Sequence, residues 1–233
     1  MNTKLELIDL KKKMKPKTAI DHYEFFAKEY DPLSKKHEWY SPEVLFGLAF
    51  EFVKRGQKLL DIGIGTGQSS LLFKKVGLEI YGIDGSNEML KICEKKHIAK
   101  DLKRFDLTEI PLPYIPKSFD HIISNGVFYF FKDIEPFFIE AERLIKGKGT
   151  FNFTVEDLKG TSNQEYVNKD NDLISERITE KVGVHVYRHS EKYILSLIKK
   201  YNFELLKKME YFAYNSPTEN RDVYFKAYVL KKS

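Results

Sequence analysis

The chain has 233 residues, of which 42% are apolar and 31% charged, a composition typical of globular proteins. Its apolar runs are too short to cross a bilayer, and its single cysteine, Cys93, excludes an internal disulfide and a cysteine-cluster metal site. The first residues contain no apolar segment that would serve as a secretory signal, so we expect a single cytoplasmic domain.

The net charge of +5 is concentrated in the first 20 residues, where six lysines stand against Glu6 and Asp9. A basic arm of this kind is typical of a solvated terminal segment, and it also suits a segment that steers an anionic partner such as RNA. The charge alone does not choose between these interpretations. The six lysines are Lys4, Lys11, Lys12, Lys13, Lys15 and Lys17.

From residue 56 onward, short apolar segments alternate with amphipathic ones. Ahead of them, Ser41-Pro42-Glu43 predicts a helix capped by Ser41, which we expect to run to about Arg55 and to stop at Gly56. The alternation predicts parallel βαβ units in a doubly wound α/β sheet. The expected strands are 58–62, 79–84, 102–105, 119–125 and 149–155, and the expected helices are 68–76, 86–96 and 133–145.

The end of the chain follows a different pattern. A helix is predicted over 190–201, and two long alternating segments, 203–214 and 222–231, predict an antiparallel hairpin. The preceding segment, 156–189, begins as a polar loop and then alternates Val182, Val184 and Val186, which favours a short strand. Because this segment starts at the carboxyl end of a strand, we expect it to cover a ligand site at that edge of the sheet, together with residues 20–40.

A glycine-rich turn follows the first predicted strand. Gly63, Gly65 and Gly67 are spaced Gly-x-Gly-x-Gly, which differs from the Gly-x-Gly-x-x-Gly pattern of pyrophosphate-binding turns. Glycines at these positions allow a tight turn and a close approach of the backbone to a ligand. Asp61 stands directly before the turn, where a carboxylate suits a cationic amino group better than a phosphate.

Two further acids end the next strands. Asp84 ends the second predicted strand, where a carboxylate can accept both hydrogen bonds of a ribose diol. Asp106 follows the third, where it can accept from an adenine amino group. Because open α/β sheets bind ligands at the carboxyl ends of their strands, the three acids together predict one nucleoside-binding site.

With these motifs, the chain resembles the class I S-adenosylmethionine-dependent methyltransferases over roughly residues 56–154. Within that superfamily it is most similar to small-molecule-type enzymes and to the Williams–Beuren-region methyltransferase-like group. The resemblance implies a Rossmann-like seven-stranded sheet of order 3-2-1-4-5-7-6 with the last strand antiparallel. It also implies S-adenosyl-L-methionine as cofactor, S-adenosyl-L-homocysteine as product, and cofactor contacts from Asp61, Gly63, Gly65, Gly67, Asp84, Gly85, Met89, Asp106, Leu107 and Asn125.

The reaction needs few catalytic groups, because the sulfonium is already an activated methyl donor. No spacing of histidines and carboxylates indicates a metal site. His189, just before a predicted helix, is the best candidate for a base on the substrate side, although a structural position next to the helix start explains it better.

Three hypotheses about function stay open at this point. The first is a methyltransferase for an unidentified small molecule, the second a protein or RNA methyltransferase that uses the basic arm, and the third a non-catalytic module that binds the cofactor. We expect one methyltransferase domain with an N-terminal helical cap segment (1–55), a cofactor-binding core (56–154), an insertion that covers the substrate (155–189), and a C-terminal helix and hairpin (190–233).

Overall fold

The structure is a computed structural model that describes residues 18–157, 174–178, 184–216 and 221–233. The lysines of the basic arm, the polar loop that opens the segment 156–189, and Val182 lie outside these ranges. In the described part of the chain, no helix is long and apolar enough to cross a membrane.

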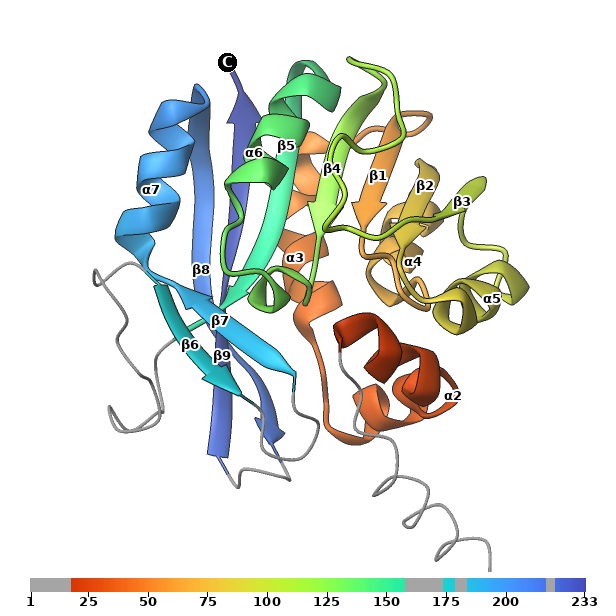
Figure 1. The fold of residues 1–233 in the computed structure, drawn as a ribbon. Helices are drawn as coiled ribbons and strands as arrows, with labels where there is room; N and C mark the ends of the chain where they lie inside the picture. Colours follow the sequence, from red (N-terminus) through yellow and green to blue (C-terminus); the bar gives the residue numbers. More distant parts are fainter. Residues whose placement is uncertain (1–17, 158–173, 179–183, 217–220) are drawn as a thin grey trace, which may run out of the picture.

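A seven-stranded sheet forms the centre of the molecule, in the order β3-β2-β1-β4-β5-β9-β8 (Figure 1). The pairs from β3 to β5 are parallel, whereas β9 is antiparallel to both β5 and β8. Counted within this sheet alone, β8 and β9 are the sixth and seventh strands, so the expected order with an antiparallel last strand is confirmed. The strands are β1 (Lys58–Ile62), β2 (Glu79–Asp84), β3 (Asp101–Arg104), β4 (Phe119–Ser124), β5 (Ile145–Glu156), β8 (Phe203–Ser216) and β9 (Arg221–Lys232).

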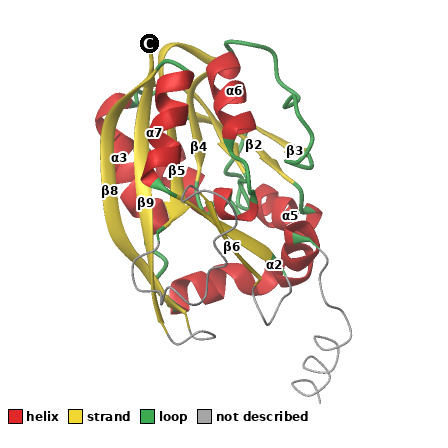
Figure 2. Ribbon diagram, turned by 60° about the vertical axis from the view of Figure 1, so that its left-hand side comes forward, coloured by secondary structure: helices red, strands yellow, loops and turns green. Residues whose placement is uncertain are grey.

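Helices cover both faces of this sheet (Figure 2). One face is covered by α6 (Glu135–Leu144) and α7 (Glu191–Lys200). Phe137 and Phe138 of α6 and Leu197 of α7 are buried in one cluster with Phe151 and Phe153 of β5. On the other face, three helices bury a second apolar cluster against the sheet. These three helices are α3 (Ser41–Ala49), α4 (Gln68–Lys75) and α5 (Asn87–Lys95).

The helix that begins near Ser41 differs from its prediction. Tyr40 occupies the N-cap position of α3, and Ser41 is the first helical residue, with its hydroxyl bonded away from the helix. The helix ends at Ala49 and continues only as the 3-10 turn η1 (Phe50–Phe52). The expected cap and the expected end at Arg55 are therefore wrong. Ser86 and Ser190, by contrast, cap α5 and α7 with their hydroxyls.

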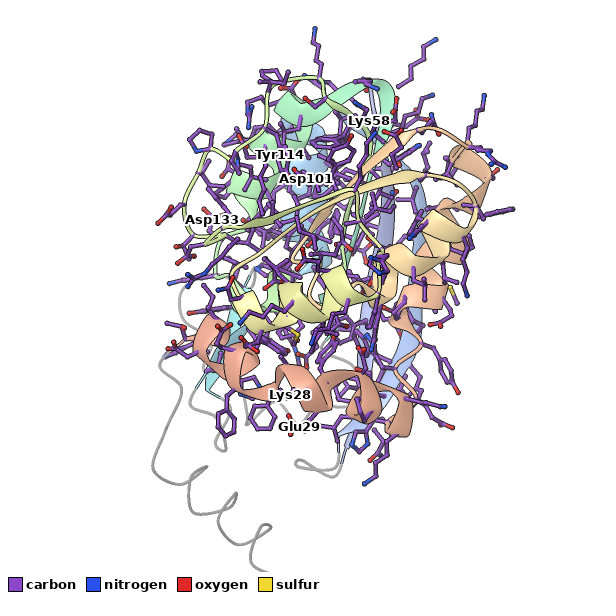
Figure 3. All side chains as sticks on the ribbon, turned by 90° about the vertical axis from the view of Figure 1, so that its right-hand side faces the viewer. Lys28, Glu29, Lys58, Asp101, Tyr114 and Asp133 are labelled. Atoms are coloured by element: carbon purple, nitrogen blue, oxygen red, sulfur yellow. The ribbon has the colours of Figure 1, made fainter. Side chains whose placement is uncertain are left out.

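An N-terminal helix, α2 (Ala19–Lys36), lies across the carboxyl ends of the central strands (Figure 1). Its start is a capping box, in which Thr18 and Asp21 each accept a hydrogen bond from the other's backbone N–H. Two backbone N–H groups at the start of the helix thus have side-chain acceptors. Figure 3 shows α2 at one end of the molecule, with Lys28 and Glu29 upon it, and Lys58 and Asp101 at the opposite end of the sheet.

A separate two-stranded antiparallel sheet consists of β6 (Ile174–Ile178) and β7 (His185–His189). Strand β7 contacts the end of β5 and the 3-10 turn η2 (Phe128–Phe130), which follows β4. The short strand expected around residues 182–186 is therefore present, shifted towards the C-terminus. Its position brings part of the segment 156–189 to the carboxyl edge of the main sheet.

Candidate functional site

The carboxyl ends of β1, β2, β3 and β4 open into one cavity of about 620 Å³. Helix α2 and strand β7 also line it, so the cavity is covered on the side opposite the sheet. Its volume lies within the roughly 300–1,000 Å³ of small-molecule pockets, and carboxyl ends of parallel strands are where open α/β sheets bind ligands. Among the expected cofactor contacts, those that line the cavity are Gly63, Gly65, Asp84, Gly85, Met89, Asp106, Leu107 and Asn125.

The glycine-rich turn after β1 forms one wall of this cavity. Gly63, Gly65 and Gly67 all have positive φ angles, of 76°, 53° and 85°. Residues other than glycine rarely adopt such angles. A Cβ on Gly63 would lie 2.4 Å from Val127, and one on Gly67 would lie 2.9 Å from the sulfur of Cys93. A Cβ on Gly65 would have no atom within 4 Å. The open space beside Gly65 is therefore available to a ligand, whereas Gly67, which does not line the cavity, serves helix packing.

Asp84 is held in a fixed orientation beside this turn. Its Oδ2 accepts from Gly65 N at 2.8 Å, and its Oδ1 accepts from Ser86 N at 2.8 Å. Burial raises the pKa of Asp84, and the two backbone N–H groups counteract that effect. Each carboxylate oxygen keeps further lone pairs, so the group can accept two more hydrogen bonds from a diol in the cavity.

Asp61 lies beneath the turn and not on the cavity wall. Its side chain is 1% exposed, and its Oδ2 accepts from the Ser70 hydroxyl at 2.7 Å. Burial raises the pKa of the Asp61 carboxyl from about 3.8 to about 7, despite that hydrogen bond. In the described structure the residue therefore supports the turn from below.

Asp106 and its neighbours line the far end of the cavity. The Oδ1 of Asp106 accepts from the backbone N and the hydroxyl of Thr108, at 2.9 and 2.8 Å. This turn leaves Oδ2 without a hydrogen bond from any described residue. Leu107 and the buried Met89 of α5 supply apolar surface to the same cavity.

Two carboxylates of α2, which the sequence patterns did not indicate, bind the helix to residues around the cavity. Asp31 accepts from the Thr66 hydroxyl at 2.6 Å and from Gln68 Nε2 at 2.7 Å, and it forms an ion pair with Lys96. Although burial raises the pKa of Asp31, the hydrogen bonds from Lys96, Thr66 and Gln68 outweigh burial and lower it. We name this group of contacts the Asp31 latch.

The second carboxylate, Glu24, accepts from the Ser86 hydroxyl at 2.6 Å and from Glu88 N at 3.2 Å. It therefore ties α2 to the first turn of α5. The only local signal for α2 was the Thr18-x-x-Asp21 spacing of a capping box; the partners of Asp31 and Glu24 are far away in the chain.

Aromatic side chains form another part of the cavity wall. Tyr23 of α2 contacts Tyr129 through their hydroxyls at 3.3 Å and packs edge-on against Phe130. Trp39 packs edge-on against Phe225 of β9. Tyr30, Phe131, His185 and Tyr187 also line the cavity.

His189 is not among the described residues that line the cavity. Its Nε2 lies 3.2 Å from the carbonyl oxygen of Lys132, and its ring stacks on Tyr193. Burial lowers the pKa of His189 to about 4. Of its neighbours on β7, Arg188 is buried in an ion pair with Glu156, while Tyr187 reaches the cavity.

Comparison with known proteins agrees with this geometry. Residues 60–153 match the family described as "Methyltransferase domain". A demethylmenaquinone methyltransferase of Thermotoga maritima is 31% identical over 131 residues, which are 52% of this chain and 56% of that protein. The chain thus aligns with about half the length of this curated relative.

Two solved structures extend the likeness in fold to most of the chain. An S-adenosylmethionine-dependent methyltransferase of Methanosarcina mazei has a TM-score of 0.66 at 16% identity, covering 79% of this chain and 96% of that one. Another, a possible histamine N-methyltransferase of Thermotoga maritima, has a TM-score of 0.65 at 20% identity, covering 91% and 98%. Residues 60–153 therefore carry a methyltransferase domain, and the chain has the fold of the S-adenosylmethionine-dependent methyltransferases.

Proposed function

We propose that the protein transfers a methyl group from S-adenosylmethionine to a small molecule held in the same cavity. The observation that carries this proposal is the pairing of Asp84 with Gly65. A fixed carboxylate and an open, left-handed glycine lie side by side on the wall of a covered cavity. That combination suits a nucleoside ligand whose diol meets the carboxylate and whose body passes close to the backbone.

The residues present fit this cofactor along its length. Asp84 would accept the two ribose hydroxyls, and Asp106 would accept from the adenine amino group with its Oδ2. Met89 and Leu107 would pack against the adenine ring. Asp61 would act from beneath the turn, through its charge, on the amino-acid end.

When bound, S-adenosylmethionine supplies a methyl group already activated on a sulfonium. The protein's own task is then to hold an acceptor in line with that methyl group and to exclude water. Tyr23, Trp39 and Phe130 provide an apolar wall suited to both tasks. Burial raises the pKa of Tyr23, so its phenol stays protonated and does not serve as a base.

A small acceptor suits this site, because α2 and β7 line a cavity whose volume is that of a small-molecule pocket. Helix α2 and strand β7 thus act as a cap in this proposal, and the acceptor enters when one of them moves. Hydrogen exchange tests the cap directly. Amides of α2 and β7 should gain protection when S-adenosylhomocysteine is added, and unchanged exchange would contradict a cap.

A methyl-transfer screen tests the activity. The protein is incubated with S-adenosylmethionine labelled in its methyl group and with separate panels of small amines, phenols, thiols and carboxylates, of unstructured RNA, and of peptides. Transfer to a small molecule that is lost in Asp84→Ala supports the proposal. Transfer to RNA or peptide alone would favour the macromolecular alternative, and cofactor binding without any transfer would favour a non-catalytic module.

A further inference from the structure

Aromatic side chains gather at one end of the cavity. They come from helix α2, from the segment between α2 and α3, from η2 and the residue after it, and from strand β7. Because these parts of the chain are far apart in sequence, the fold itself brings the rings into one cavity. The five residues, which we name the aromatic end, are Tyr23, Trp39, Phe130, Phe131 and Tyr187.

The aromatic end and the two acids assigned to the nucleoside lie on opposite sides of β1. Asp84 ends β2 and Asp106 follows β3, whereas Phe130 belongs to η2, which follows β4. Trp39 packs edge-on against Phe225 of β9, with 5.2 Å between the ring centroids, and β9 lies two places beyond β4 in the sheet. In the proposed function, the aromatic end is therefore the part of the cavity that remains for the acceptor.

The aromatic end has no matching cation among the described residues. Arg104, at the end of β3, donates with its Nε to the carbonyl oxygen of Gly85 at 3.3 Å, which places it on the nucleoside side. His185 of β7 is exposed. An anionic acceptor in the aromatic end would thus meet no fixed positive charge from the described part of the chain. Apart from tyrosines, the ionisable residues described on the cavity wall are Asp21, Asp84, Arg104, Asp106 and His185.

This distribution of charge distinguishes the classes of acceptor. In methyl transfer, a lone pair of the acceptor bonds to the methyl carbon, the bond from that carbon to sulfur breaks, and its electron pair stays on sulfur. Phenols, thiols and carboxylic acids react best as anions, and burying an anion without a partner is costly. A neutral amine loses no proton before it reacts, and its nitrogen takes over the positive charge that leaves the sulfonium.

The aromatic rings favour this transfer of charge. The face of an aromatic ring attracts a cation through its quadrupole, so rings around the nitrogen stabilise the ammonium as it forms. Apolar surroundings also lower the pKa of an amine, which favours the neutral form beside the sulfonium. A neutral amine needs no base to begin the reaction, which agrees with a protonated Tyr23 and with the place of His189 away from the described cavity wall.

We infer that the methyl acceptor is an amine on an apolar body, which meets the sulfonium as a neutral nitrogen and leaves as an ammonium with one more methyl group. This inference rests on the proposed function. The aromatic end holds the acceptor before the transfer and the positive charge after it. Where the acceptor nitrogen carries hydrogen, the product gives up its extra proton to water on release.

A matched pair of probes tests the inference on protein saturated with S-adenosylhomocysteine. Choline carries a quaternary ammonium, and 3,3-dimethylbutanol has the same shape with carbon in place of nitrogen. Beside the neutral sulfur of S-adenosylhomocysteine, choline reproduces the charge distribution after transfer. We expect choline to bind on the order of tenfold more tightly than the alcohol in calorimetry. Equal binding of the two, tighter binding of the alcohol, or no binding of choline would overturn the inference.

Variants of the rings locate the preference. Trp39→Leu keeps an apolar side chain and removes a ring, so it should bind S-adenosylhomocysteine as the wild type does and lose most of the preference for choline. Phe130→Leu should act in the same way, and Trp39→Phe should keep much of the preference. Tyr40→Leu is the matched control, because Tyr40 is 53% exposed and is not among the described residues of the cavity wall. An unchanged preference in both leucine variants of the aromatic end would overturn the assignment.

Methyl transfer gives a second readout, which separates the inference from the proposed function. N-methylbenzylamine, benzyl mercaptan and phenylacetate compete in one mixture for the labelled methyl group of S-adenosylmethionine. Label on the amine supports the inference. Label on the mercaptan or the carboxylate alone would overturn it and leave the proposed function standing. Failure of the wild-type protein to bind S-adenosylhomocysteine would instead overturn the proposed function.

Discussion

Asp61→Asn should make the protein more stable at neutral and alkaline pH. The substitution keeps the size of the side chain and an oxygen for the Ser70 hydroxyl, and it removes a buried charge. Burial raises the pKa of Asp61 from about 3.8 to about 7, so the folded state holds this proton more tightly than the unfolded state does. The stability that Asp61 contributes is therefore complete below about pH 4 and is lost as the pH rises to about 7.

The size of the effect follows from that difference in pKa. Each unit of difference in pKa between the folded and unfolded states corresponds to about 1.4 kcal/mol, so ionisation of Asp61 lowers the stability of the wild-type protein by up to roughly 4 kcal/mol at pH 8. Asparagine does not titrate. The free energy of unfolding of Asp61→Asn should thus exceed that of the wild type by about 2–4 kcal/mol at pH 8, and the excess should shrink towards pH 5.

Urea unfolding of the ligand-free protein, followed by circular dichroism from about pH 5 to about pH 8, measures this difference. Asp31→Asn is the control of opposite sign. Because the pKa of Asp31 is lowered, its contribution to stability is present throughout this range and is lost only at lower pH. That variant should be less stable than the wild type by an amount that does not change with pH. A pH-independent difference in Asp61→Asn, or a loss of stability at pH 8, would refute the reasoning.

Three further variants test the site. Asp84→Ala should weaken S-adenosylhomocysteine binding by about 2–4 kcal/mol in calorimetry, and wild-type affinity would show that the ribose assignment is wrong. Gly65→Val should abolish this binding while costing only about 1–3 kcal/mol of stability, because its φ of 53° is unfavourable but no atom lies within 4 Å of the new Cβ; an intact affinity would mean that the ligand does not approach this turn. Asp31→Ala should open the Asp31 latch, so amides of α2 should exchange faster without ligand. Unchanged exchange in that variant would contradict the latch.

The parts of the fold that were predictable depend on local patterns. The apolar strands, the Gly-x-Gly-x-Gly turn and the acids at the ends of β2 and β3 are each encoded within about ten residues. Their meeting at one edge then follows from the parallel arrangement of the strands. For this reason Gly65, Asp84 and Asp106 lie together on the cavity wall, and their contacts with the cofactor stay a prediction.

The contacts that close the site depend on distant partners and could not be predicted in this way. Ser41 has the sequence context of a helix cap, yet its hydroxyl bonds to Tyr211, which lies 170 residues away. Asp31 meets Lys96 only because α2 folds back over the sheet. Strand β6 is stabilised by pairing with β7 and has no alternating pattern of its own. Asp61 shows the same limit, because its position before the turn did not reveal that burial would remove it from the cavity wall.

Calorimetric titration of the purified protein with S-adenosylhomocysteine, and separately with NADH, tests the central claim most directly. The Gly-x-Gly-x-Gly turn, the fixed carboxylate of Asp84 and the covered cavity predict saturable binding of S-adenosylhomocysteine with one site per chain and no comparable binding of NADH. The absence of S-adenosylhomocysteine binding, or tighter binding of NADH, would contradict the claim.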